Sequence, residues 1–151
     1  MIMILNWDIK PYSDLNINEF HDIVALRIKV FVIEQNCPYQ DLDGKDKKAY
    51  HIFCRDGKGN IVSTARILPN GISYPEVSIG RVVVDESVRG TGVGHELIKR
   101  CIDFINAEFG QVTVVISAQK HLEKYYKNHG FVKNSDEYME DGIPHIQMRR
   151  D

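Results

Sequence analysis

A glycine-rich loop between an apolar segment and an amphipathic one has the clearest chemical potential in this sequence. The loop reads Arg89-Gly90-Thr91-Gly92-Val93-Gly94, and it closely follows the apolar run Val82-Val83-Val84. Glycines carry no side chain, so successive backbone N–H groups can surround a bulky anion. The N-terminus of the helix that follows adds the favourable end of its dipole. The pattern therefore predicts a phosphate or pyrophosphate site.

Two common nucleotide-binding loops do not fit this pattern. A P-loop needs a lysine directly after its last glycine, and His95 stands after Gly94. The dinucleotide fingerprint needs a third glycine at the position of His95, and it belongs to the first strand–helix–strand unit of a chain. This loop lies past the middle of the chain. A glycine-rich turn without a ligand is the remaining alternative.

The regular elements around the loop can be predicted from apolar periodicity and turn residues. Strands are expected at 5–9, 50–55, 61–68, 77–84, 111–117 and 144–148, and a short helix at 121–129. A first helix begins at Asn16, whose spacing to Glu19 is that of a capping box, and ends before Pro38. A second helix runs from the glycine loop to a cap at Gly110. The apolar stripe expected on the first helix is Phe20, Val24, Ile28 and Phe31.

This order of elements predicts one domain of the α/β (α+β) class, with a mixed, mostly antiparallel, twisted sheet and helices on both faces. The length of 151 residues and the 43% hydrophobic content suit a single core. A net charge of −2 gives no broad basic field, so no nucleic-acid partner is expected. No apolar run has transmembrane length, and Met1–Leu5 is expected to lead into the first strand rather than to be a signal peptide. Three cysteines without metal spacing favour a reducing cytoplasm.

The spacing Arg89-x-x-Gly92-x-Gly94 after an apolar strand resembles motif A of the GNAT superfamily of acetyl-CoA-dependent N-acetyltransferases. The segment Tyr125–Phe131 resembles the Tyr-x4-Gly-Phe segment of the same superfamily. Arg27, the segments 31–35 and 37–40, and the tail 140–146 are similar to its ElaA-like branch. The resemblance covers most of residues 5–149.

The resemblance implies a GNAT fold and acetyl-CoA as co-substrate, with no metal. It implies backbone hydrogen bonds to the pantetheine arm from Val82, Val83 and Val84, and a positive charge near the phosphates from Arg89. Gln119 stands where many members place an asparagine that contacts the cofactor. The N–H groups that the pyrophosphate would contact belong to Gly90, Thr91, Gly92, Val93, Gly94 and His95.

For catalysis, the resemblance points to Tyr126, because a phenol near the thioester can protonate a departing thiolate. Tyr125 turns to another face of the helix and is expected to pack. The general base stays open, since many members carry a glutamate where this chain has Val114. Glu34 and His145 are the candidates retained for the base, with Glu140 and His51 as further options.

Two other functional hypotheses stay open. The segments 27–31, 65–69 and 80–82, with the acidic residues Asp41, Asp43 and Asp46, are similar to acyl-homoserine lactone synthases, which suggests an ion-paired arginine–aspartate scaffold on the acceptor side. The missing strand glutamate would also suit a non-catalytic acyl-CoA-binding module. The expected partner is a small-molecule or peptide amine. Superfamily members frequently dimerise, so a homodimer is a further option.

Overall fold

Eight strands form one sheet in the order β1-β2-β3-β4-β5-β8-β6, with β7 paired to β8. The computed structural model describes residues 4–151. The strands are β1 Asn6–Pro11, β2 Tyr50–Arg55, β3 Ile61–Leu68, β4 Val77–Val84, β5 Val114–Gln119, β6 Val132–Lys133, β7 Tyr138–Glu140 and β8 Ile143–Arg150. The α-helices are α1 Ile17–Arg27, α2 Val93–Phe109 and α3 Glu123–Lys127, and Ile28–Glu34 continues α1 as a π-helix. Neighbouring strands are antiparallel except for β4 and β5.

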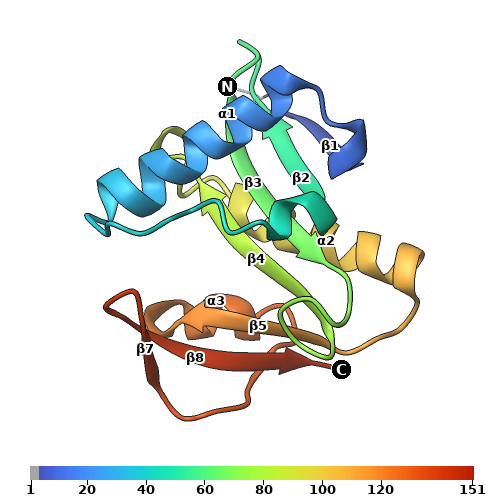
Figure 1. Ribbon diagram of the computed structural model, residues 1–151, viewed down its shortest axis with the longest axis vertical. Coiled ribbons are helices and arrows are strands. Elements are labelled where there is room, and N and C mark those ends of the chain that lie inside the picture. The colour runs from blue at the N-terminus through green and yellow to red at the C-terminus, as the bar shows by residue number, and fades with distance from the viewer. Residues whose placement is uncertain (1–3) are drawn as a thin grey trace.

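The helices cover both faces of the sheet, as the order of elements predicts (Figure 1). On one face, α2 buries Leu97, Ile98 and Ile105 in a cluster that includes Tyr126 and Phe131. On the other face, α1 packs against β2, β3 and β4 through a second cluster of Ile23, Leu26, Val30, Phe53, Ile61 and Val83. Successive strand residues point to opposite faces, so Ile52 joins the first cluster and Phe53 the second.

The stripe predicted for the first helix is confirmed only in part: Phe31 packs against the second cluster, and Phe20 and Val24 are half-buried, but Ile28 is exposed. The buried residues of α1 are Glu19, Ile23, Leu26 and Arg27, whereas Ile28 is 38% exposed. The helix turns this way because Arg27 faces inward to bind two aspartates, which places its neighbour Ile28 outside. The capping box is confirmed: the amide of Glu19 donates to Asn16 Oδ1 at 2.7 Å, and the amide of Asn16 donates to Glu19 Oε1 at 3.0 Å.

Strands β4 and β5 separate soon after they meet. Their parallel pairing consists of Val77 with Val114 and Ser78 with Val115. Beyond this point β5 stays paired with β8 as far as Gln119 and His145, and β4 stays paired with β3 as far as Val84 and Ser63. A wedge therefore opens in the middle of the sheet, and the backbone of β4 loses its neighbour on one side.

A β-bulge changes the direction of the backbone of β4 beside the wedge. The register of β3 and β4 shifts between Thr64 and Arg66, and Arg81 takes a left-handed φ of 50°. Farther along, the amide of Asp85 donates to the carbonyl oxygen of Val62 at 2.8 Å. Because hydrogen-bonded and non-bonded pairs alternate in an antiparallel ladder, Val83 directs its backbone groups towards β3. By the same alternation Val84 directs its backbone groups towards the wedge, and Val82, inside the bulge, lines the cavity there.

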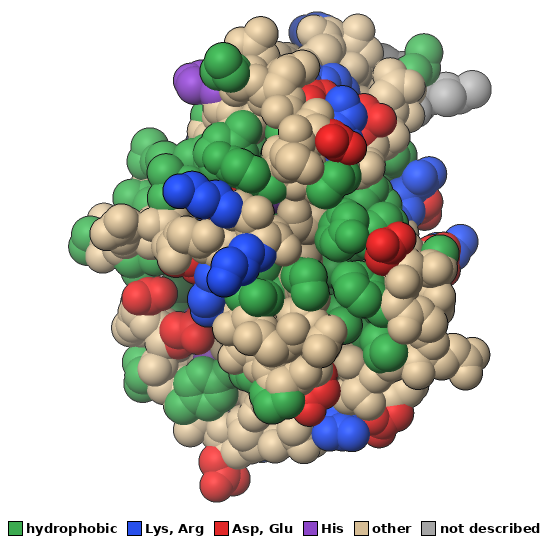
Figure 2. All heavy atoms as spheres, turned by 45° about the vertical axis from the view of Figure 1, so that its right-hand side comes forward, with side chains coloured by type: hydrophobic (Ala, Val, Ile, Leu, Met, Phe, Trp, Pro, Cys, Tyr) green, Lys and Arg blue, Asp and Glu red, His purple; other side chains and the backbone are tan. Residues whose placement is uncertain are grey.

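The surface carries charges of both signs. On the face shown in Figure 2, basic and acidic side chains are interspersed with apolar ones, and no basic field gathers there. No helix in the part of the chain that the structure describes has the length and hydropathy to cross a membrane.

Candidate active site

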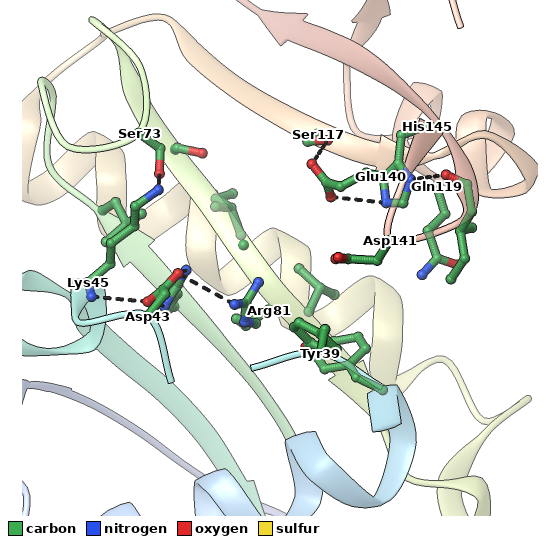
Figure 3. A pocket seen from close by; sticks show the side chains of 18 of the residues that line it. Tyr39, Asp43, Lys45, Ser73, Arg81, Ser117, Gln119, Glu140, Asp141 and His145 are labelled. Atoms are coloured by element: carbon green, nitrogen blue, oxygen red, sulfur yellow. Dashed lines mark hydrogen bonds and ion pairs between the residues drawn. The ribbon is translucent and has the colours of Figure 1, made fainter. Parts of the chain in front are cut away.

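A cavity of about 480 Å³ lies at the wedge between β4 and β5 (Figure 3). Strand β4 contributes Ser78–Val82 to its lining, and β5 contributes Ser117 and Gln119. The segment after α1 adds Phe31, Gln35, Cys37 and Tyr39, and α3 adds Tyr126. Glu140, Asp141 and His145, from β7, β8 and the turn between them, close the remaining side. The cavity thus joins segments from the whole length of the chain at the place where the sheet is open.

The glycine loop has the geometry of an anion cradle. Gly90 and Gly92 have φ values of 78° and 89°, in the region that residues with side chains rarely adopt. Gly92 is the N-cap of the 17-residue helix α2, and no side chain caps the free amides of the first turn. Gly94 lies under Tyr125: a Cβ there would come within 3.3 Å of the tyrosine hydroxyl oxygen. Because no side chain caps this first turn, its backbone N–H groups are free to bind an anion.

Arg89 and Glu34 form an ion pair with each other. Arg89 Nη1 lies 2.7 Å from Glu34 Oε2, and Arg89 Nη2 donates to Glu34 Oε1 at 3.0 Å. The Nε of Arg89 donates to the carbonyl oxygen of Val84 at 3.0 Å. The hydrogen bond to Glu34 raises the pKa of the Arg89 guanidinium. Glu34 does not line the cavity. Arg89 thus has its donors engaged near the loop, and Glu34 lies apart from the cavity.

Tyr125 and Tyr126 have different surroundings, as expected from their positions on a helix. Tyr126 is 6% exposed, packs edge-on against Phe131 with ring centroids 5.9 Å apart, and lines the cavity. Burial raises the pKa of its phenol above the ordinary value. Tyr125 instead donates a hydrogen bond to the carbonyl oxygen of Gly94.

His145 is the buried histidine of the cavity wall. Its side chain is 8% exposed, and its Nε2 lies 3.3 Å from Glu140 Oε2. Its Nδ1 lies 2.7 Å from the carbonyl oxygen of Ile143. A carbonyl oxygen only accepts hydrogen bonds, so Nδ1 carries a proton and donates to Ile143, and Nε2 is the ring nitrogen that faces Glu140. Ser117 Oγ donates to Glu140 Oε1 at 3.3 Å and lies 2.5 Å from the hydroxyl of Tyr138.

The other candidates are placed as follows. Gln119 lines the cavity opposite His145 and donates to Gln35 Oε1 at 3.4 Å. His51 is fully buried outside the cavity, with Nε2 3.0 Å from the carbonyl oxygen of Asp46. Burial lowers its imidazole pKa, so His51 is neutral and suits packing. Val114 lies in the short paired part of β4 and β5 and is 1% exposed.

Three arginines and three aspartates form a closed ring beside the cavity. Arg27 binds Asp41 at 2.9 Å and Asp46 at 2.8 Å, and Arg66 binds Asp46 at 3.1 Å and Asp43 at 2.7 Å. Arg81 closes the ring, with Nε 3.0 Å from Asp41 Oδ1 and Nη2 3.4 Å from Asp43 Oδ2. This is the ion-paired scaffold that the sequence suggested, and it connects α1, the segment 41–46, β3 and the bulge of β4 to one another.

Several cavity residues carried no signal in the sequence. Lys45 lies in a loop whose charges look like an ordinary solvated surface, and Ser73 and Ser117 belong to no recognisable motif. The pairing of β8 with both β5 and β7 brings Ser117 and Asp141 to the same wall of the cavity, with Tyr138 in contact with Ser117 behind it. Among residues 4–151, no group of three or more His, Cys, Asp or Glu side chains is placed to hold a metal ion.

This fold and its open wedge are those of an acyltransferase of the GNAT type, and the comparisons with known proteins agree. The acetyltransferase (GNAT) domain model matches residues 11–151, so the chain belongs to the GNAT family. It is similar to protein ElaA of Escherichia coli, with 37% identity over 148 residues that cover 97% of each chain. A UPF0039 protein of Synechocystis is 39% identical over 97% of this chain and 95% of its own.

Solved structures agree. The acyl-CoA N-acyltransferase from Pseudomonas aeruginosa superposes with a TM-score of 0.93 and 39% identity, over 98% of this chain and all of that one. The E. coli ElaA structure gives a TM-score of 0.92 and 37% identity, with 98% and 100% of the two chains covered. The GNAT fold and the ElaA-like resemblance are therefore confirmed, and acyl transfer is the general chemistry of the family.

Proposed function

We propose that this chain transfers the acetyl group of acetyl-CoA to a primary amine of a small-molecule or peptide acceptor, by direct attack of the amine on the thioester. The observation that carries this proposal is the wedge between β4 and β5. It lies between an anion cradle and a cavity that contains both a buried phenol and a buried histidine. One substrate would lie along the wedge and the other in the cavity.

The cradle would bind the pyrophosphate of the co-substrate through the N–H groups of residues 90–95. The backbone groups of Val84 that face the wedge, and those of Val82 in the cavity wall, would pair with the amides of the pantetheine arm, in the place that β5 has vacated. Val83 directs its backbone to β3 and would contribute packing. Gln119, at the end of β5, would contact the arm from the other side.

His145 with Glu140 would act as the general base. An ammonium must lose a proton before its nitrogen can attack, and Nε2 of His145 would accept it. The carboxylate of Glu140 at 3.3 Å would stabilise the imidazolium that forms. The pair also explains how the chain can dispense with a strand glutamate, since the base comes from β7 and β8 instead.

Attack would form a C–N bond and place negative charge on the carbonyl oxygen, which the N–H of Val82 would stabilise. When the C–S bond breaks, the Tyr126 hydroxyl would give its proton to the sulfur. The geometry supports this role, because the Tyr126 side chain lines the cavity and its hydroxyl can donate a hydrogen bond. The amide nitrogen releases its surplus proton, and the tyrosine regains one from solvent.

The test is thiol release from acetyl-CoA with a panel of primary amines, run beside Tyr126→Phe and with longer acyl-CoA thioesters. Amine-dependent release that is fastest with acetyl-CoA and falls in the variant supports the proposal. Faster release with a longer acyl chain would overturn its acetyl part. Tight binding of acetyl-CoA without release for any amine would instead support a non-catalytic binding module, which the presence of Val114 in place of a glutamate would suit.

A further inference from the structure

The cavity has charges left over once its internal ion pairs are counted. Six of its lining side chains are charged: Asp43, Lys45, Arg66, Arg81, Glu140 and Asp141. Asp43, Arg66 and Arg81 belong to the arginine–aspartate ring, in which three positive charges pair with three negative ones. The remaining charged residues, Lys45, Glu140 and Asp141, do not belong to this ring.

Lys45 is a half-buried cation without an acidic partner. Its Nζ donates to Ser73 Oγ at 2.8 Å, and within residues 4–151 no carboxylate lies at ion-pairing distance from it. Glu140 and Asp141 likewise have no lysine or arginine partner in the described chain; Glu140 contacts His145 and Ser117. Figure 3 shows Lys45 and Ser73 at one end of the cavity, and Glu140, Asp141 and His145 at the other.

The proposed reaction would take place at the acidic end of the cavity, where Glu140 and Asp141 lie. His145 lies opposite Gln119 in the β5–β8 register, beside the wedge. An ammonium group beside the Glu140–His145 pair would be attracted by the Glu140 carboxylate and could pass its proton to the imidazole. At the far end, Lys45 would meet whatever the acceptor carries beyond its amine. An anionic group there would form an ion pair with the Lys45 ammonium.

We infer that the acceptor is a zwitterion, a primary amine with a carboxylate several carbon atoms away, bound with its ammonium at Glu140 and Asp141 and its carboxylate at Lys45. This inference rests on the proposed function. It disfavours diamines, because their second ammonium would face Lys45. It also disfavours α-amino acids, because their two charged groups share one carbon atom and cannot reach both ends.

The test is a series of ω-amino acids from glycine to 6-aminohexanoate, each compared with its carboxamide and with the diamine of equal length. Thiol release from saturating acetyl-CoA gives kcat/KM for each acceptor. The best ω-amino acid is expected to exceed its carboxamide by about tenfold, the effect of one charge-assisted hydrogen bond. Equal rates for acid and carboxamide, or a preference for the diamine, would overturn the inference while leaving the acetyltransferase function standing.

Lys45→Met tests the assigned contact. It should lower kcat/KM for the ω-amino acid by about tenfold and leave the carboxamide unchanged. Lys48→Met is the matched control, because Lys48 is an exposed lysine of the same turn outside the cavity lining. An acid preference that survives Lys45→Met would overturn the assignment.

A binding measurement separates this inference from the proposed function. The same acids and carboxamides are titrated calorimetrically into protein saturated with CoA. If no amine releases thiol, the proposed function fails. The inference then stands only if binding requires both the carboxylate and Lys45, and it is overturned if neither affects binding.

Discussion

The hydroxyl of Tyr125 donates a hydrogen bond to the carbonyl oxygen of Gly94, which joins α3 to the glycine loop at the start of α2. The ring of Tyr125 also lies 4.9 Å from that of His95, in the same first turn. The neighbouring Tyr126 faces the cavity. The two adjacent tyrosines therefore lie at different places: Tyr125 at the start of α2, and Tyr126 in the wall of the cavity where we propose that the thioester reacts.

Tyr126→Phe should lower kcat by about 10²-fold or more, since a general acid contributes about 10²–10⁴-fold. Its affinity for acetyl-CoA should stay unchanged, because phenylalanine fills the same buried space. Tyr125→Phe should do the reverse and weaken acetyl-CoA binding with a smaller effect on kcat. Steady-state kinetics with calorimetric binding would separate the two effects. Equal losses of kcat in both variants would contradict this difference between the two tyrosines.

Gly94→Ala should weaken acetyl-CoA binding by about tenfold or more. The new Cβ would lie 3.3 Å from the Tyr125 hydroxyl oxygen and 3.5 Å from Val84 Cγ2, so the tyrosine or the loop must move. A one-methyl insertion into a packed site costs about 1–3 kcal/mol. Gly57→Ala is the control, because nothing lies within 4 Å of the Cβ that it adds. Unchanged affinity in Gly94→Ala would argue against a cradle at this turn.

Glu34→Gln and Glu140→Gln distinguish the two acidic candidates for catalysis. Glu34 is held by Arg89 outside the cavity, so its amide variant should keep kcat within about twofold and lose at most ~1 kcal/mol of stability, as for an exposed pair. Glu140→Gln should lower kcat, because the imidazolium of His145 would lose the carboxylate that stabilises it. A larger loss in Glu34→Gln would reverse the assignment.

Acid should unfold this chain in part through Asp46. Burial alone would raise the carboxyl pKa of Asp46, but hydrogen bonds from Arg27 and the charges of Arg27 and Arg66 outweigh it, and the pKa falls below the ordinary 3.8. The folded state therefore binds the Asp46 proton less readily than the unfolded state does. The stabilisation is complete above the unfolded pKa and is lost as the pH falls through the lower, folded pKa.

Asp46→Asn removes this dependence and leaves Arg27 and Arg66 without one of their partners. It should lower the free energy of unfolding at pH 7 by about 3–5 kcal/mol, as expected when a buried ion pair loses one member. The slope of stability against pH below pH 4 should also become shallower. Urea unfolding followed by circular dichroism between pH 2 and pH 7 measures both effects. A parallel acid limb in the variant would show that other carboxylates govern acid unfolding.

The long strands could be predicted because their apolar runs end at clear turn residues. The bounds of Tyr50–Arg55, Ile61–Leu68 and Val77–Val84 agree with the structure. Strand β5 begins at Val114 rather than at residue 111, and β1 runs from Asn6 to Pro11 rather than over 5–9. The strands β6 and β7 have two and three residues and were not predicted, because alternation cannot be recognised over so few positions.

The glycine loop and the tyrosine segment could be recognised because each is contiguous in sequence. The cavity could not be recognised, because its wall combines a loop near residue 45 with a turn near residue 141. The buried stripe of α1 was predicted only in part for a related reason. An arginine that faces inward does so for partners 14 and 19 residues away, which apolar periodicity does not register.

The ring of Arg27, Asp46, Arg66, Asp43, Arg81 and Asp41 also constrains how this chain can diverge. Each member contacts two of opposite charge, so replacing one leaves two neighbours unmatched, and no single replacement restores the balance. The six positions are therefore expected to be inherited together or lost in pairs. Homologues that retain the whole set should share the shape of the cavity wall to which Asp43, Arg66 and Arg81 contribute.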